Sequence, residues 1–386
     1  MDTAAWYAAS VPLYALYVAL EVVIARRRGK RAFGFAETIS NLTAGLGTLL
    51  VGIFVGPWVL RAWNFAHDHV APFPWPAHGA WKLPAAWILA DFCYYAYHRA
   101  GHRFAIFWSI HGIHHQHEHL NSSVGFRLEW LADPYAALFF GLMPLAGVDS
   151  TTGFSAIALL SVYALLAHSS VLRWPSLGVF VTPAVHGAHH SRDGRFTEKN
   201  FGAMLAIWDR IFGTWREPAK NDVLQADVPS ICRTHDGVSA QWGLVRELGR
   251  ALRAAPLRAW PHLLSSRPVV AGPPVPLRRD DEIAGPARRY VFVHFVLLAA
   301  LGGWLLLFAK VPVLVALVLS VTIVIGLFSL GGVLDGRARA PRTEKLRLAI
   351  TAVIGVVVAP FALGFGIALV AVSCLGLVIA PRWLAS

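Results

Sequence analysis

Long apolar stretches alternate with polar or basic segments along most of this 386-residue chain. A helix needs about 20 mostly apolar residues to cross a bilayer, and nine stretches approach this requirement. They cover residues 6–24, 41–63, 83–97, 130–146, 154–168, 290–309, 311–333, 349–363 and 365–380. The pattern predicts an all-α integral membrane protein with about nine transmembrane helices.

The basic residues predict which ends of these helices face the cytoplasm. The cluster Arg26–Arg31 follows the first apolar stretch, so that stretch is typical of an uncleaved first span with its N-terminus outside. With nine crossings, this cluster, residues 98–119, residues 173–289 and residues 337–347 all fall on one side. Because Lys and Arg collect in cytoplasmic loops, we expect that side to be cytoplasmic.

A long polar segment separates two groups of apolar stretches. Residues 173–289 are rich in Arg, Pro and His and contain no stretch of spanning length. We therefore expect three parts. Residues 1–215 form a membrane domain that carries the candidate chemistry, residues 216–289 form a basic cytoplasmic linker with surface helices, and residues 290–386 form a C-terminal domain of four transmembrane helices.

The composition supports a membrane location and narrows the chemistry. Hydrophobic residues make up 56% of the chain and charged residues only 15%, whereas a soluble chain carries about 25% charged residues. The net charge of +12 comes from basic residues beside the apolar stretches, as expected for cytoplasmic loops. The charge therefore does not indicate a nucleic-acid partner. Cys93, Cys232 and Cys374 form no CxxC pair, which argues against disulfides and against a thiolate-rich metal site.

Three histidine clusters are the main chemical signal in the sequence. They read HRAGH, HGIHH and HGAHH, and their histidines are His98, His102, His111, His114, His115, His186, His189 and His190. On a helix, residues spaced by three or four lie on one face, and eight imidazoles suit two metal ions that each keep an open position. Imidazole binds iron, copper, zinc and nickel, and the spacing alone does not choose among them. The alternative, a solvated pH-sensing patch, is less favoured.

The sequence around these clusters resembles a known family of membrane enzymes. The segments DFCYYAYHRAGHR, FWSIHGIHHQHEHLN and VHGAHHSRDGRFTEKNFGAMLAIWDRIFGTW are similar to the fatty acid hydroxylase/sterol desaturase superfamily of membrane diiron oxygenases. The resemblance covers about Asp91 to Trp215. It implies a helical membrane domain with the histidine boxes in a cytosolic cap, two Fe ions as cofactors and O2 as cosubstrate. The implied reaction is hydroxylation or desaturation of a lipid C–H bond with external electrons.

The resemblance also suggests further residues of the site. It implies that His168 is a ninth metal ligand. Because metal-bound histidines usually donate their second N–H to a carboxylate or carbonyl, Asp91, Glu118 and Asn200 are expected in the second shell, with Glu129 and Asp193 as further candidates. His117 and His119 are expected in a solvated loop or in the second shell. The other six histidines are not assigned to the metal: His67, His69, His78, His235, His262 and His294.

The layout of nine spans, with the histidine boxes in the first five, resembles the alkylglycerol monooxygenase-like branch. Members of that branch hydroxylate the carbon next to an ether oxygen and so cleave O-alkyl lipids. Arg103 stands where that branch tends to carry Glu, which leaves the substrate open. The sequence does not choose between a pterin and an electron-transfer protein, as redox partner, for the reductant. It also leaves the oligomeric state open. The alternative is a non-catalytic polytopic membrane protein that binds metal, either a transporter or a sensor.

Overall fold

The computed structural model describes residues 3–172, 174–219, 222, 233–265, 277–307, 311–360 and 363–383. These residues form helices and loops, without a β-sheet. The α-helices are α1 (Thr3–Arg27), α2 (Phe35–His69), α3 (Lys82–Arg103), α4 (Ala105–His111), α5 (Ala132–Phe140), α6 (Leu142–Leu145), α7 (Ser150–Ala167), α8 (Pro183–His189), α9 (Ile207–Ile211), α10 (Gly237–Ala254), α11 (Trp260–Ser265), α12 (Gly285–Leu307), α13 (Val313–Leu334), α14 (Ala340–Val358) and α15 (Leu363–Trp383). Short 3-10 helices are η1 (Ser122–Phe126), η2 (Gly194–Phe196), η3 (Leu257–Ala259) and η4 (Asp280–Glu282).

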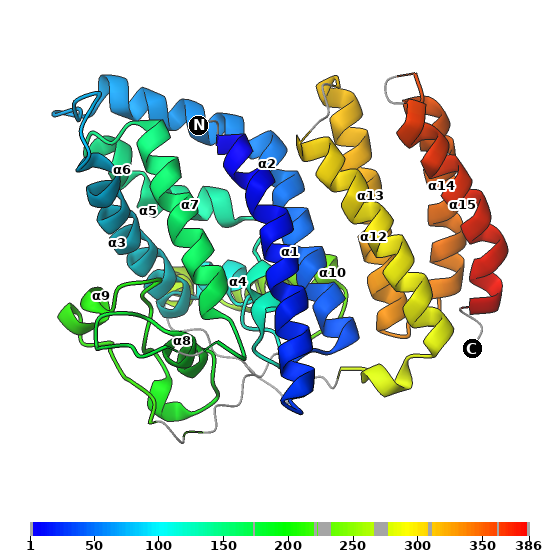
Figure 1. The fold of residues 1–386 in the computed structure, drawn as a ribbon, viewed down its shortest axis with the longest axis horizontal. Helices are drawn as coiled ribbons and strands as arrows, with labels where there is room; N and C mark the ends of the chain where they lie inside the picture. The colour runs from blue at the N-terminus through cyan, green and yellow to red at the C-terminus, as the bar shows by residue number, and fades with distance from the viewer. Residues whose placement is uncertain are drawn as a thin grey trace.

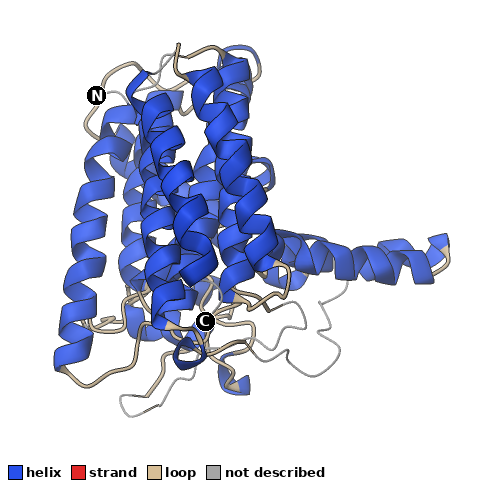
Figure 2. Ribbon diagram, turned by 90° about the vertical axis from the view of Figure 1, so that its right-hand side faces the viewer, coloured by secondary structure: helices blue, strands red, loops and turns tan. Residues whose placement is uncertain are grey.

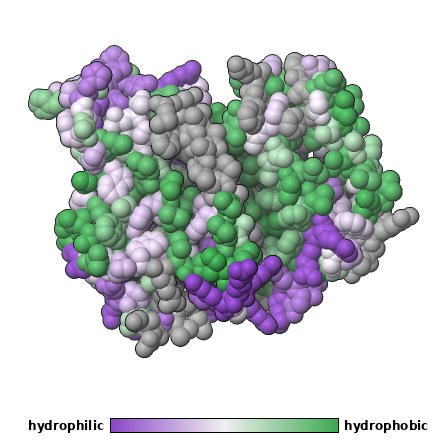
Figure 3. Space-filling view, viewed as in Figure 1, coloured by the Kyte–Doolittle hydropathy of each residue, from purple (hydrophilic) through white to green (hydrophobic). Residues whose placement is uncertain are grey.

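Four of the described helices are long and apolar enough to cross a membrane: α2, α7, α12 and α13. They support the expectation of a membrane protein, whereas the count of nine spans stays a prediction. The longer helices run along one another in Figure 1, and apolar side chains cover much of the surface in Figure 3. Val313 and Val353, for example, are 74% and 64% exposed. Such surfaces suit contact with lipid rather than water.

Two of the expected spans differ from the structure. The stretch 130–146 is not one helix, because the chain forms α5 and then the four-residue α6, with Gly141 between them. The stretch 41–63 lies inside the 35-residue helix α2, which contains Pro57. In Figure 1 the later part of α2 turns and runs across the top of the bundle. Since proline removes a backbone hydrogen bond and bends a helix, Pro57 is consistent with this turn.

The last four helices stand together at one side of the bundle (Figure 1). Their shared core includes Leu298, Leu319 and Leu348, each at most 4% exposed. A buried polar group also lies there. Arg347 donates to Glu344 across 2.6 Å, and the hydroxyl of Tyr290 donates to the same carboxylate across 2.5 Å. This group joins α12 to α14.

Helix α10 lies across the lower end of the bundle. Asp236 caps its first turn by accepting from the backbone N–H groups of Val238 and Ser239, at 3.0 and 3.1 Å. The helix lies behind α4 in Figure 1 and projects sideways from the bundle in Figure 2. One of its faces is buried through Ala240 and Leu244, and Ala240 packs with Ala44 of α2 and Ile113. Part of the expected linker is therefore packed beside the second histidine cluster.

The start of α2 is tied to a distant part of the chain. The carboxylate of Asp280 accepts hydrogen bonds from the backbone N–H groups of Phe35 and Ala36, the latter at 2.9 Å. Glu37, in the same turn, is buried and accepts from the backbone N–H groups of Glu118 and His119, at 2.6 and 3.1 Å. The first turn of α2 thus connects η4 with the loop that follows the second histidine cluster.

Candidate metal centre

The first histidine cluster lies at the end of α3. His98 and His102 are one helical turn apart, so both rings point to the same side of the helix. The helix ends at Arg103, and Phe104 is extended. This arrangement matches the expectation from the HxxxH spacing.

The second cluster is less helical than its spacing predicts. His111 is the last residue of α4. His114 and His115 follow in a turn, in which the N–H of His114 donates to the carbonyl of His111 at 3.0 Å and that of His115 to Gly112 at 3.3 Å. The three rings remain neighbours, with centroids 5.2 to 5.5 Å apart. The prediction of a helix through all three histidines is wrong, because α4 ends at His111, but the turn still keeps the three rings together.

The third cluster lies on the short helix α8, and His168 lies at the end of α7. Thr182 caps α8 by accepting from the backbone N–H of Val185, and Pro183 occupies the first turn, where proline fits well. His186 and His189 lie on this helix and His190 is its C-cap. His168 is the C-cap of α7.

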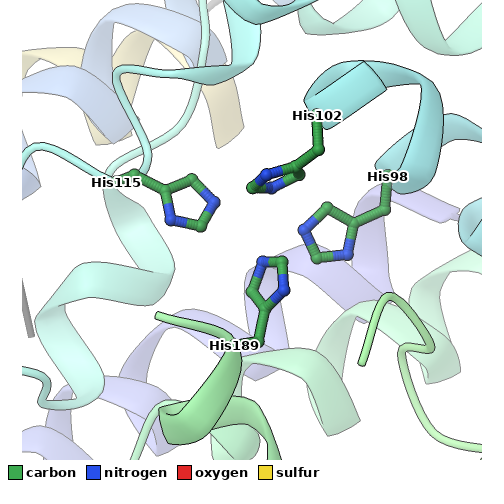
Figure 4. A group of neighbouring side chains, drawn as sticks. All are labelled: His98, His102, His115 and His189. Atoms are coloured by element: carbon green, nitrogen blue, oxygen red, sulfur yellow. The ribbon is translucent and has the colours of Figure 1, made fainter. Parts of the chain in front are cut away.

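The histidines converge into two groups of four. His98, His102, His115 and His189 form the first group, and His114, His168, His186 and His190 form the second. Within each group the nitrogen atoms that could bind a metal all lie within 4.8 Å of one another. In Figure 4 the four rings of the first group surround a common space, and they come from three separate segments of the chain.

The nitrogens of both groups fit metal ligation. In the first group, the Nε2 atoms of all four histidines are buried without a hydrogen-bond partner. In the second group, Nε2 of His168 lies 3.0 Å from Nε2 of His114 and 3.0 Å from Nε2 of His186, which in turn lies 3.1 Å from Nε2 of His190. Burying so many polar nitrogens without partners is costly, and a cation in each group would remove that cost.

Burial also keeps these imidazoles neutral. It lowers the pKa of His189 to about 3 and the pKa of His168 to about 4. Burial likewise lowers the pKa values of His114, His115, His186 and His190 well below the ordinary value. A neutral imidazole has a free lone pair, which is the form that binds metal.

His111 belongs to neither group of four. Its Nε2 is buried without a hydrogen-bond partner, and its ring centroid lies 5.0 Å from that of His98 and 5.5 Å from that of His114. It therefore borders both groups. Its role as a metal ligand stays a prediction.

The second nitrogen of several histidines is fixed by a protein acceptor. Nδ1 of His98 lies 2.9 Å from the carbonyl oxygen of Phe201, and Nδ1 of His189 lies 2.8 Å from that of Lys199. His168 and His114 pair in the same way with the carbonyls of Ala164, at 2.8 Å, and Arg127, at 3.3 Å. His111 pairs instead with the buried carboxylate of Glu129, at 2.6 Å. These contacts set the ring orientations and leave Nε2 free for the metal.

The loop that supplies two of these carbonyls is held by a buried aspartate. Asp209 is fully buried and accepts from the backbone N–H groups of Phe201 and Gly202, at 2.9 and 2.8 Å, and from the hydroxyl of Thr214, at 2.6 Å. Nδ1 of His98 pairs with the carbonyl of the same Phe201. The KNFG…WDR segment thus supports two histidines of the first group, His98 and His189. In the sequence this segment carries only the family resemblance, and no role of Asp209 is expected from it.

The three residues expected around the ligands make other contacts. Asp91 accepts from Trp208 Nε1 at 2.8 Å and from two backbone N–H groups of the same loop. Glu118 pairs with Arg233 at 2.5 Å. Asn200 has a positive φ of 61° and bonds both ways with the backbone of Arg216. All three support the loops around the site, while Glu129, a further candidate, contacts a box histidine directly.

The remaining candidates divide between the site and the surface. His117 is buried rather than solvated, and its Nε2 lies 2.9 Å from Nδ1 of His190. His119 is partly exposed and pairs with Glu37 at 2.9 Å. Asp193 pairs with Arg195 at the surface. The six unassigned histidines belong to neither group of four.

Residues 83–214, which contain both groups of histidines, match the fatty acid hydroxylase family model. This match covers about a third of the chain, and within it the chain is similar to fatty acid hydroxylases. The chain is also similar to curated relatives. It is 26% identical to the alkylglycerol monooxygenase of Homo sapiens over 363 residues, which are 88% of this chain and 80% of that protein.

Two shorter similarities concentrate on a smaller part of the chain. The ornithine lipid hydroxylase OlsE of Rhizobium tropici is 29% identical over 158 residues, or 40% of this chain and 47% of that protein. A delta(7)-sterol 5(6)-desaturase of Aspergillus fumigatus is 25% identical over 170 residues, or 41% of this chain and 44% of that protein. No solved structure matches the chain significantly.

Proposed function

We propose that the protein is a membrane-bound diiron oxygenase that uses O2 and external electrons to hydroxylate a lipid C–H bond. The observation that carries this proposal is the convergence of eight histidines, seven of them buried and His102 half-buried, into two groups of four. The family of residues 83–214 and the relatives named as lipid hydroxylases and monooxygenases support the same class. Desaturation is the related outcome, since one of the relatives is a desaturase.

The residues of the chain hold, orient and shield the metal pair. One iron would lie among His98, His102, His115 and His189, and the other among His114, His168, His186 and His190. Bound iron would supply the activation of O2, which no amino-acid side chain provides. The carbonyls of Phe201, Lys199 and Ala164 and the carboxylate of Glu129 orient the rings. The buried ring of Phe201, whose centroid lies 5.4 to 5.7 Å from those of three histidines of the first group, helps to exclude water.

An ether lipid with a glycerol headgroup is the substrate class that we favour. The support is the similarity to an alkylglycerol monooxygenase, which spans 88% of this chain and so extends far beyond the histidine clusters. In this reaction the carbon next to the ether oxygen is hydroxylated. The resulting hemiacetal then breaks down to an aldehyde and a free glycerol hydroxyl.

The histidine groups also argue against a metal transporter. Transporters bind their cargo near the middle of the bilayer, between broken helices. Here the ligands lie at the ends of α3, α4 and α7 and in the segments that follow them. We propose that this end of the bundle faces the cytoplasm, where soluble electron donors are available.

The proposal can be tested by lipid analysis of cells that express the protein. Cells would be fed a 1-O-alkylglycerol and, in parallel, the ester-linked glycerol lipid of the same chain length. We expect release of the fatty aldehyde, or its oxidised acid, from the ether lipid with the wild type and none with His115→Ala. The purified wild type should contain close to two irons per chain, one for each histidine group. A wild-type protein that stays iron-free after iron-replete expression would overturn the proposal.

A further inference from the structure

The second nitrogen of His190 has an unusual partner. Four of the other histidines pair through Nδ1 with a backbone carbonyl, and His111 pairs through Nδ1 with the carboxylate of Glu129. Nδ1 of His190 instead lies 2.9 Å from Nε2 of His117. The two rings are 1% exposed each, with their centroids 5.0 Å apart. The contact between the two rings is therefore shielded from water.

The hydrogen positions in this pair follow from the geometry of the second group. Nε2 of His190 lies 3.1 Å from Nε2 of His186 and thus faces the position of the metal. A neutral imidazole that binds metal through Nε2 carries its proton on Nδ1. That proton points at Nε2 of His117, which must accept it, so His117 carries its own proton on Nδ1.

The backbone around His117 fixes the position of its ring. The N–H of His117 donates to the carbonyl of His115, at 3.0 Å. The next two backbone N–H groups, of Glu118 and His119, both donate to the carboxylate of Glu37 on α2. The loop is therefore pinned on both sides of His117. These contacts fix the backbone from which the ring of His117 reaches His190.

We propose that His117 is a positioning residue for the metal of the second histidine group, and that it acts by accepting the Nδ1 proton of His190. The proposal rests on the proposed function, because it requires a metal in that group. His117 is the acceptor that distinguishes the second group, since Nδ1 of His114 and of His168 pair with backbone carbonyls. The two metal sites are thus chemically unequal.

The test compares His117→Met, which removes the acceptor, with His117→Gln, whose side-chain oxygen can take the place of Nε2. His119→Gln is the matched control, because His119 lies on the same loop but pairs with Glu37 rather than with a box histidine. Each change would be made in the wild type and in a His189→Ala background, which disables the first group. Purified proteins in nanodiscs would be titrated anaerobically with Fe2+ against a chromogenic ferrous chelator, and 57Fe Mössbauer spectra recorded.

We expect His117→Met to weaken Fe2+ binding in the His189→Ala background about 10- to 100-fold, the usual effect of losing a partner of a ligating histidine. His117→Gln should restore most of the affinity, and His119→Gln should leave it unchanged. In the wild-type background, one of two Mössbauer signals should change. Equal affinity for His117→Met and the background protein would overturn the inference, as would equal weakening by His117→Gln and His117→Met.

The two proposals fail in different ways. A wild-type protein that binds no Fe2+ contradicts the proposed function itself. A wild-type protein that binds two ions, together with a His117→Met protein that binds both equally well, contradicts only the role of His117. If His117→Met does not fold, His117→Leu, which also lacks an acceptor, takes its place in the same comparison with His117→Gln and His119→Gln.

Discussion

Asp209 and His98 are linked through a single residue, Phe201. The carboxylate of Asp209 accepts from the N–H of Phe201 at 2.9 Å, and the carbonyl of Phe201 lies 2.9 Å from Nδ1 of His98. A buried acid that contacts no histidine nitrogen therefore fixes a histidine of the first group. The link spans more than a hundred residues of sequence.

Asp209→Asn should lower both stability and iron binding. The amide group of Asn cannot accept from both Phe201 and Gly202, so one buried N–H loses its partner, at a cost of about 1–3 kcal/mol. We expect a lower melting temperature in detergent and less iron per chain after anaerobic loading. Asp193→Asn is the control, since that carboxylate pairs with Arg195 at the surface. Normal iron content in Asp209→Asn would show that the loop does not support the metal site.

Glu129 should fix both the orientation of the His111 ring and the position of its proton on Nδ1. Its carboxylate lies 2.6 Å from Nδ1 of His111, and both side chains are at most 5% exposed. Glu129→Ala removes this acceptor, and the usual loss for such a partner is about 10- to 100-fold in metal affinity. Fe2+ competition with a chelator measures this loss. Unchanged affinity would mean that His111 does not bind metal, whereas partial recovery in Glu129→Gln would support the orienting role.

The two groups should lose metal separately. His189→Ala removes a nitrogen from the first group and His168→Ala removes one from the second. We expect each variant to retain one of the two irons and the double variant to retain none, as measured by metal analysis of protein loaded with Fe2+. Retention of both irons in His168→Ala would remove His168 from the ligand set.

The contact between His119 and Glu37 should make stability depend on pH. The hydrogen bond to the Glu37 carboxylate raises the pKa of His119, so the folded protein holds this proton more tightly than the unfolded chain does. The stabilisation is fully present below the unfolded pKa, about 6.5, and is lost as the pH rises through the folded pKa. The difference in melting temperature between wild type and His119→Gln should therefore shrink from mildly acidic to alkaline pH. A constant or growing difference would contradict this assignment.

The buried ion pair of the C-terminal helices should matter for stability but not for metal binding. Arg347→Leu leaves Glu344, which is fully buried, without its cation, and breaking one partner of such a pair costs about 3–5 kcal/mol. The double variant Glu344→Gln/Arg347→Leu should be more stable than the single one. Thermal unfolding in nanodiscs tests this order. Protein that remains folded should bind iron as the wild type does.

The sequence predicted the box histidines better than it predicted their surroundings. Spacing and a family resemblance were enough to select His98, His189 and the other members of the two groups, because ligands must be specific side chains. The acceptors for their second nitrogens are mostly backbone carbonyls, such as those of Phe201 and Lys199. Because every residue has a backbone carbonyl, residue type does not predict which carbonyl will accept. Only the folded loop, with positive φ angles at Glu198 and Asn200, brings these carbonyls to the rings.

Hydropathy predicted where helices lie better than where they break. The apolar stretch 130–146 looked continuous, but the structure divides it at Gly141 into α5 and α6. Likewise, the spacing of HGIHH suggested a helix, yet α4 stops at His111. In both places tertiary packing overrides the local pattern. The window average that detects a span cannot detect such a break.

The Asp280 contact at the start of α2 has a consequence for where the chain can be divided. Although the family model ends at residue 214, a fragment cut there would lack the carboxylate that accepts from Phe35 and Ala36. The next residue along, Glu37, anchors the backbone of Glu118 and His119. Removing the chain after residue 214 would therefore weaken the support of the loop that contains Glu118 and His119, although Asp280 lies far from that loop in the sequence. Asp280 thus links the C-terminal part of the chain, through the first turn of α2, to the loop that follows the second histidine cluster.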